Sequence, residues 1–327
     1  LMHFLNAVLV TRAWQGLNGT ATSSTLAGLF FLCSGSIYQN LIFIHGTSRV
    51  LCILLFLLAT HSWIEFLRSR APFSFLKTMV FQVLALLTKE DALAFPWIAL
   101  FLCFRLVTKE EGRGRILTRY WPWILASHAL TAVFNLQSFI FSPLRAEKLF
   151  LPGDGFAKIV SLVEMFLRPL LIPERGYFSP LFSQEDTLRL LPALLVLVLL
   201  LGLFSKKERL KFFLATLPRP LLVTAAGWIP IATVPFLFQS LTFEHANRYL
   251  YLPLVGFSFL FGGVVAGLIE TVQKFFSQRA TVIGWSLVVY ILVLGLQTTA
   301  FQYQRYKKHV EERPREHFYH EVKRLFE

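Results

Sequence analysis

The sequence predicts an all-α polytopic membrane protein. The chain has 327 residues, of which 55% are hydrophobic, and its mean hydropathy is +0.58. A helix needs roughly 20 apolar residues to cross a bilayer core, and several apolar runs of the chain reach that length. Basic residues concentrate between these runs, as in the connecting loops of membrane proteins. This pattern excludes a soluble domain of ordinary composition.

The apolar runs predict about ten membrane spans. A membrane domain is therefore expected over residues 1–301, followed by a short basic tail over 302–327. Position 1 is Leu rather than Met, so we expect the natural chain to begin upstream. The predicted spans lie near residues 1–15, 24–44, 48–67, 73–88, 91–107, 119–142, 187–204, 219–239, 248–269 and 281–301.

The basic loops predict how these spans are oriented. Lys and Arg are enriched in cytoplasmic loops, so we assign the face that carries most of them to the cytoplasm. Both ends of the sequence then lie on the outer face. The expected location is a bacterial inner membrane, or the endoplasmic reticulum membrane of a eukaryote. The loop residues are Arg68, Arg70, Lys77, Arg105, Lys109, Arg113, Arg115, Arg119, Lys206, Lys207, Arg209, Lys211, Lys274 and Arg279.

The formal charge of +13 is explained by these loops and by anionic lipid headgroups. Nucleic-acid binding is disfavoured because the basic residues form no continuous groove. The three cysteines, Cys33, Cys52 and Cys103, lie inside apolar runs without CxxC spacing, which predicts buried thiols. The sequence contains no motif of a soluble hydrolase, nucleotide-binding enzyme or metalloprotease. We expect no metal site and no tightly bound cofactor.

The longest non-membrane segment, residues 143–186, is rich in Pro and Gly. Within it, Phe156–Ile172 has apolar residues at helical spacing, which predicts an amphipathic helix on the outer membrane surface. The alternative is a plain connecting loop. The tail 302–327 mixes apolar and charged residues and reads as a surface helix. This loop and tail are the expected contacts for partner membrane or periplasmic proteins, or for lipid.

A dense polar stretch, residues 244–248, stands directly before an apolar run. Charge beside hydrocarbon must be paired or hydrated, and the guanidinium of Arg248 suits a phosphate. Tyr249 and Tyr251 follow as rings typical of the headgroup layer. The alternative is an interfacial anchor in which Arg248 pairs with Glu244.

Two further polar stretches fall on the same predicted face. One is the turn 88–91, which lies between two short apolar segments and contains Lys89 and Glu90. It is either a simple hairpin turn or a polar lining of a cavity. The other is 44–49, which ends in Arg49. The sequence therefore predicts that Arg49, Lys89, Glu90, His245 and Arg248 converge on one side of the membrane.

Several segments resemble one family. Leu86–Leu93 (LLTKEDAL) resembles the "LLSKE-x-A" turn of polytopic glycosyltransferases of the C superfamily, and 246–257 (ANRYLYLPLVGF) is similar to their "AERYLYLPSVGF". Gly46–Leu51 resembles "GRSDLL", His3–Asn6 resembles "HLLN", and Phe166–Pro173 resembles "YLRxLLxP". The order and spacing match over nearly the whole chain. The group includes protein O-mannosyltransferase-like enzymes that carry tetratricopeptide repeats.

The resemblance implies transfer of a sugar from a polyprenyl-phosphate donor to an acceptor on the periplasmic or luminal face. The lipid-linked sugar would be a substrate. Cations would stabilise the charge that develops on the leaving phosphate. On this reading the residues that bind lipid phosphate are Arg248, Lys89, Arg49 and Tyr251. The candidates for catalytic acid or base are Glu90, Glu244 and His245.

The chain also departs from the family pattern. It begins where the second span would begin, so the first outer loop, where members carry a catalytic acid, is not in this sequence. Asn247 stands where Glu is usual, Val50 where Asp is frequent, and no repeats follow residue 301. The alternative function is therefore a catalytically silent membrane subunit that binds partner proteins or lipid. A third possibility is a transporter of lipid-linked sugars, which the lack of an internal repeat disfavours.

Overall fold

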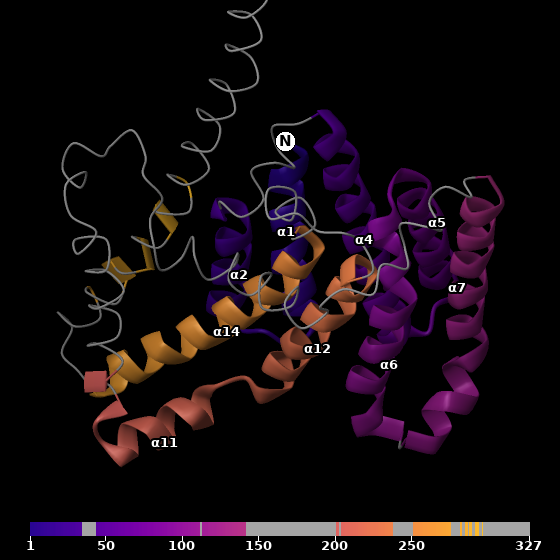
Figure 1. The fold of residues 1–327 in the computed structure, drawn as a ribbon. Helices are drawn as coiled ribbons and strands as arrows, with labels where there is room; N and C mark the ends of the chain where they lie inside the picture. The colour runs from indigo at the N-terminus through magenta and orange to yellow at the C-terminus, as the bar shows by residue number, and fades with distance from the viewer. Residues whose placement is uncertain are drawn as a thin grey trace, which may run out of the picture.

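The computed structural model describes residues 1–34, 44–111, 113–141, 201–202, 204–237 and 251–275, with a few residues between 282 and 296. Apart from short connections, these ranges are helical, and they contain no strand (Figure 1). The predicted all-α class is confirmed for this part of the chain. The elements are α1 (Met2–Gly16), α2 (Ala21–Cys33), α4 (Ile44–Ser69), α5 (Pro72–Thr88), η2 (Glu90–Ala94), α6 (Phe95–Glu111), α7 (Arg113–Phe141), α11 (Lys207–Thr216), α12 (Arg219–Leu237) and α14 (Tyr251–Phe275).

Two described helices are long and apolar enough to cross a membrane. Thr47–Ser69 of α4 has 23 residues and a hydropathy of 2.0, and α14 has 25 residues and a hydropathy of 2.1. A third span arises if α11 and Leu221–Thr233, which are bent by 69° at a short break, act as one. Two or three helices of the described ranges can therefore cross a membrane, which indicates membrane association.

The predicted count of about ten spans is not supported by the described helices. Helices do form in the apolar runs of the sequence, but several of them are too short to cross a bilayer core. For example, α2 has 13 residues and α5 has 17. At 1.5 Å per residue, a helix of 13 residues is about 20 Å long, well below the ~30 Å of a bilayer core. Composition alone did not reveal where each helix ends. The predicted spans 187–204 and 281–301 lie wholly or mostly outside the described residues.

Aromatic rings and close helix contacts build the core. Trp14 of α1 stacks on Phe259 of α14 with ring centroids 4.7 Å apart, and Trp228 of α12 packs against the same ring at 5.8 Å. Gly262 lets α14 approach α2, because a Cβ at that position would lie 2.3 Å from the Ser23 carbonyl oxygen. Small residues allow this kind of close helix packing, as in membrane bundles.

The helix bundle has two ends, one at the first turn of α14 and the other at its last turn. The 25 residues of α14 extend about 37 Å. Tyr251 at its first turn hydrogen-bonds to His3, near the start of α1, whereas Lys274 at its last turn lies over Phe212 of α11. Figure 1 shows α11 lying beside this second end of α14, away from the N-terminus of the chain.

Candidate functional site

The candidate site lies at the first end, where the chain breaks between α5 and α6. Helix α5 stops at Thr88, and Lys89 adopts an extended backbone with φ −163° and ψ 149°. One 3-10 turn, η2, follows before α6 begins at Phe95. Pro96 suits the first turn of a helix, where its missing N–H is not needed. The polar turn predicted at 88–91 is therefore present, and η2 packs against α4, α5, α6 and α12.

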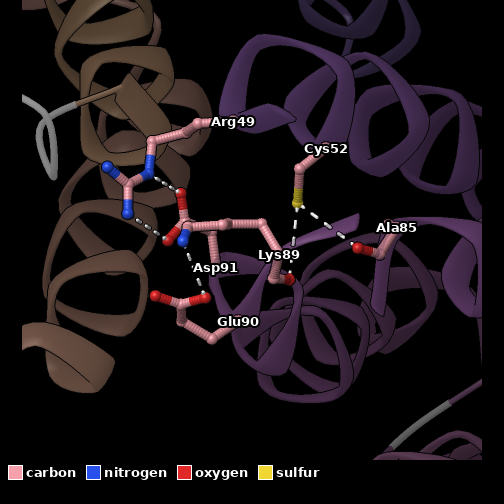
Figure 2. Close-up of polar contacts among 6 residues, drawn as sticks. All are labelled: Arg49, Cys52, Ala85, Lys89, Glu90 and Asp91. Atoms are coloured by element: carbon pink, nitrogen blue, oxygen red, sulfur yellow. Dashed lines mark hydrogen bonds and ion pairs between the residues drawn. The ribbon is translucent and has the colours of Figure 1, made fainter. Parts of the chain in front are cut away.

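A buried ion pair joins this turn to α4. The Arg49 guanidinium donates from Nε and Nη2 to the two oxygens of Asp91, with the Nη2–Oδ1 distance at 3.3 Å (Figure 2). The side chains are only 4% and 1% exposed. Burial raises the pKa of the Asp91 carboxyl, and the neighbouring guanidinium opposes that rise. This forked geometry fixes where η2 sits relative to the first turns of α4.

Lys89 and Glu90 form a second, more open pair. The Lys89 Nζ lies 3.3 Å from the Glu90 Oε2, and the two side chains are 28% and 31% exposed. Burial disfavours the ionised Glu90, but a backbone hydrogen bond, Lys89 and Arg49 outweigh it, so the pKa of Glu90 lies below its ordinary value. Glu90 is therefore an ionised partner for Lys89 at neutral pH, and it is a weak base.

The Cys52 thiol secures the end of α5. Its Sγ lies 3.6 Å from the Ala85 carbonyl oxygen and 3.7 Å from that of Lys89 (Figure 2). Both carbonyl oxygens also accept a backbone N–H, that of Ala85 from Lys89 at 3.0 Å and that of Lys89 from Ala92 at 3.3 Å, so the thiol adds weak contacts to the backbone bonds at the break. Cys52 and Cys103 are buried, as predicted, whereas Cys33 is only partly buried.

A polar network links α1, α2, α4 and α14 close to the ion pair. His3 lies with Nε2 3.1 Å from the Leu32 carbonyl oxygen, which can only accept, so its Nδ1 accepts from the Tyr251 hydroxyl at 2.7 Å. Asn6 Nδ2 donates to the same hydroxyl and to the Val50 carbonyl oxygen, both at 3.0 Å. The buried Asn6 Oδ1 is given no hydrogen-bond partner in the described part of the chain. Asn6 Oδ1 is therefore an acceptor that the hydrogen bonds of this network do not use.

Tyr251 differs most from its expected environment. The ring is fully buried, and its hydroxyl bonds to His3 and Asn6. The ring therefore faces the protein core, because the first turn of α14 packs against α1 and α2. Its place in the headgroup layer stays a prediction. Its contact with a lipid phosphate stays a prediction.

The charges of the described site balance. Arg49 faces Asp91 and Lys89 faces Glu90, so the two cations meet two carboxylates. Asp91 was not among the predicted site residues. The turn contains two adjacent acids, Glu90 and Asp91, and the sequence does not show which of them contacts α4.

The remaining predicted residues have no described position. Glu244, His245 and Arg248 lie outside the described ranges, as do the outer loop 143–186 with its helix Phe156–Ile172 and the tail 302–327. Within the described ranges, no three His, Cys, Asp or Glu side chains lie close enough together to hold a metal ion.

The described residues that carry the family resemblance form one connected group. His3 and Asn6 contact Tyr251, Asn6 also contacts Val50, and the neighbouring Arg49 binds Asp91 beside Lys89. These residues come from four segments that lie up to 248 positions apart in the chain. Searches found no match for this chain among protein-family models, curated proteins or solved structures.

Proposed function

We propose that the chain is the membrane part of a glycosyltransferase that moves a sugar from a polyprenyl-phosphate donor to an acceptor outside the cytoplasm. One observation carries the proposal. The segments that resemble this enzyme class, around His3, Arg49, Lys89 and Tyr251, meet in a single polar cluster at one end of the bundle. The two sets of contacts adjoin through the neighbouring positions Arg49 and Val50.

The cluster is proposed to face outside. Arg68, Lys274 and the basic helix α11 gather at the opposite end, and cytoplasmic ends of membrane proteins are the basic ones. The sugar donor would then be used on the periplasmic or luminal side. We also propose that residues 1 and 327 lie on this outer face and that segments 187–204 and 281–301 cross the membrane.

Burial and pairing suggest a different role for each residue of the cluster. Arg49 is buried and held by Asp91, so its role is to position η2. Lys89 is partly exposed and can leave Glu90 for a phosphate, because a partly exposed pair is weak. Lys89 and Arg248 would hold the lipid phosphate and stabilise the charge that develops as it leaves. The low pKa of Glu90 makes it a poor general base, so Glu244 and His245 remain the proposed candidates for that role.

The test uses the full chain in nanodiscs with polyprenyl phosphate and polyprenyl-phosphate sugars. We expect the chain to bind polyprenyl phosphate and to turn over a sugar donor. Lys89→Gln should weaken binding at least severalfold. Lys77→Gln is the matched control, because Lys77 lies near the other end of α5 over the Phe73 ring. Absence of binding by the unmodified chain, or equal loss in both variants, would contradict the proposal.

A second function is favoured by the charge balance of the described cluster. With Arg49 and Lys89 both paired to carboxylates, the described cluster has no surplus positive charge. A membrane subunit that keeps the fold without catalysis would show this neutrality. Binding of polyprenyl phosphate without turnover of any sugar donor in the same nanodiscs, and no dependence on Arg248, would favour this second function.

A further inference from the structure

Helix α11 packs across the end of α14 that lies farthest from the polar cluster (Figure 1). Phe213 is buried there, and its ring lies 3.4 Å from where a Cβ on Gly267 would stand. The Phe212 and Phe275 rings are 5.4 Å apart, and the Lys274 Nζ lies 3.9 Å from the Phe212 centroid. These contacts fix which side of α11 turns towards the bundle.

The opposite side of α11 combines apolar and basic residues in one strip. Lys207, Leu210, Lys211 and Leu214 follow the i, i+3, i+4, i+7 spacing of a single helix face. Leu210 is 37% exposed and Leu214 is 44% exposed, and both lysines are exposed. A strip of this kind suits an interface where leucines enter the acyl region and lysines extend to the headgroups.

The surrounding sequence adds positive charge. Between positions 206 and 219 there are five basic residues and one acidic residue, Glu208. Lys274 contributes a further cation at the same place, held over Phe212. The complementary partner is an anionic surface, and clusters of Lys and Arg beside a membrane helix bind anionic phospholipids.

The position of α11 relative to α14 supports a membrane partner. Helix α14 is long and apolar enough to cross a bilayer, and Lys274 stands in its last turn, so the membrane edge falls near that residue. The chain turns by 69° between α11 and Leu221–Thr233. Helix α11 is therefore not collinear with the segment of α12 that follows it.

We infer that α11 is an interfacial helix that binds anionic phospholipid headgroups at the leaflet where α14 ends. Leu210 and Leu214 insert at the boundary of the acyl chains, and Lys207 and Lys211 contact the phosphates. This inference concerns the end of the bundle opposite the proposed sugar-transfer site. It stands whether or not the chain transfers sugar.

Spin-label depth measurements test the insertion. In a Cys33→Ser background, which leaves Cys52 and Cys103 buried, Leu214→Cys and Glu208→Cys are labelled singly. The full chain is reconstituted in vesicles of phosphatidylcholine with phosphatidylglycerol. The label at 214 should be more accessible to oxygen than to a water-soluble nickel chelate, and the label at 208 should show the reverse. If both labels report an aqueous environment, the inference is wrong.

Lipid preference tests the charge. We expect the purified chain to retain phosphatidylglycerol over phosphatidylcholine, as measured by native mass spectrometry. A basic side chain near an anionic surface contributes about fivefold to binding, so Lys207→Gln with Lys211→Gln should cut the preference by up to about 25-fold. Lys207→Arg with Lys211→Arg keeps both charges and should leave the preference unchanged. If the Gln double variant folds normally and its lipid preference is unaltered, the inference is wrong.

Discussion

Arg49 and Asp91 form a forked ion pair inside the bundle, 42 positions apart in the chain, with both side chains almost fully buried. A buried pair costs desolvation energy when it forms, and leaving one partner alone is far more costly. The pair therefore specifies where η2 docks on α4. The Lys89–Glu90 pair next to it is about one-third exposed, so solvent screens its attraction and it contributes less to stability.

Removing one partner of the buried pair should destabilise the protein strongly. We expect Asp91→Asn to lower the free energy of unfolding by about 3–5 kcal/mol, because the buried Arg49 would lose a carboxylate partner. Glu90→Gln should change it by less than about 1 kcal/mol. The measurement is unfolding in detergent, followed by tryptophan fluorescence. Arg49→Met with Asp91→Leu should be far milder than Asp91→Asn, and equal losses in all variants would refute the pairing.

The Tyr251 hydroxyl should be energetically important although its removal creates almost no cavity. Tyr251→Phe deprives His3 Nδ1 of its donor, and an unsatisfied buried group costs about 1–3 kcal/mol. Tyr120 provides the control, since its buried hydroxyl has no hydrogen-bond partner among the described residues. We expect Tyr120→Phe to be neutral or stabilising in the same unfolding assay. The network would be disproved by a Tyr251→Phe variant as stable as the unmodified chain.

A methyl group at Gly262 should separate α2 from α14. The added Cβ would lie 2.3 Å from the Ser23 carbonyl oxygen, which belongs to backbone and cannot rotate away. Overpacking of this kind typically costs about 1–3 kcal/mol. Gly16→Ala is the comparison, because its Cβ would meet only Ile64 at an ordinary 3.6 Å. Thermal unfolding should show a clear decrease for Gly262→Ala, and no decrease there would argue against the close contact.

The stability that Glu90 contributes should depend on pH in one direction. Its pKa in the folded protein lies below that of the unfolded chain, so the unfolded state binds more protons and stability rises with pH. The contribution is fully present above the unfolded carboxyl pKa of about 4.3, and it is lost as the pH falls through the folded pKa. Comparing Glu90→Gln with the unmodified chain across this range should show a difference that disappears in acid. A constant difference would contradict the shift.

Sequence reasoning located the polar turn because Lys89, Glu90 and Asp91 interrupt an apolar stretch, which is a local signal. It placed Arg49 on the same face by counting spans. It missed the His3–Tyr251 contact, since nothing local connects residues 248 positions apart. It also missed α11 as a helix, because its charged residues were read as a loop. The number of membrane spans in the described ranges was overestimated because apolar composition continues past the residue where a helix such as α2 ends.

The buried ion pair also bears on how the protein enters its membrane. Arg49 stands near the start of α4, and Asp91 is synthesised 42 residues later, after α5. An unpaired arginine inside lipid is costly, so α4 would carry that cost alone until the acid arrives. Helices α4 and α5 pack closely and are joined by a short turn. We therefore expect the insertion machinery to release α4, α5 and η2 into the bilayer together, as one unit.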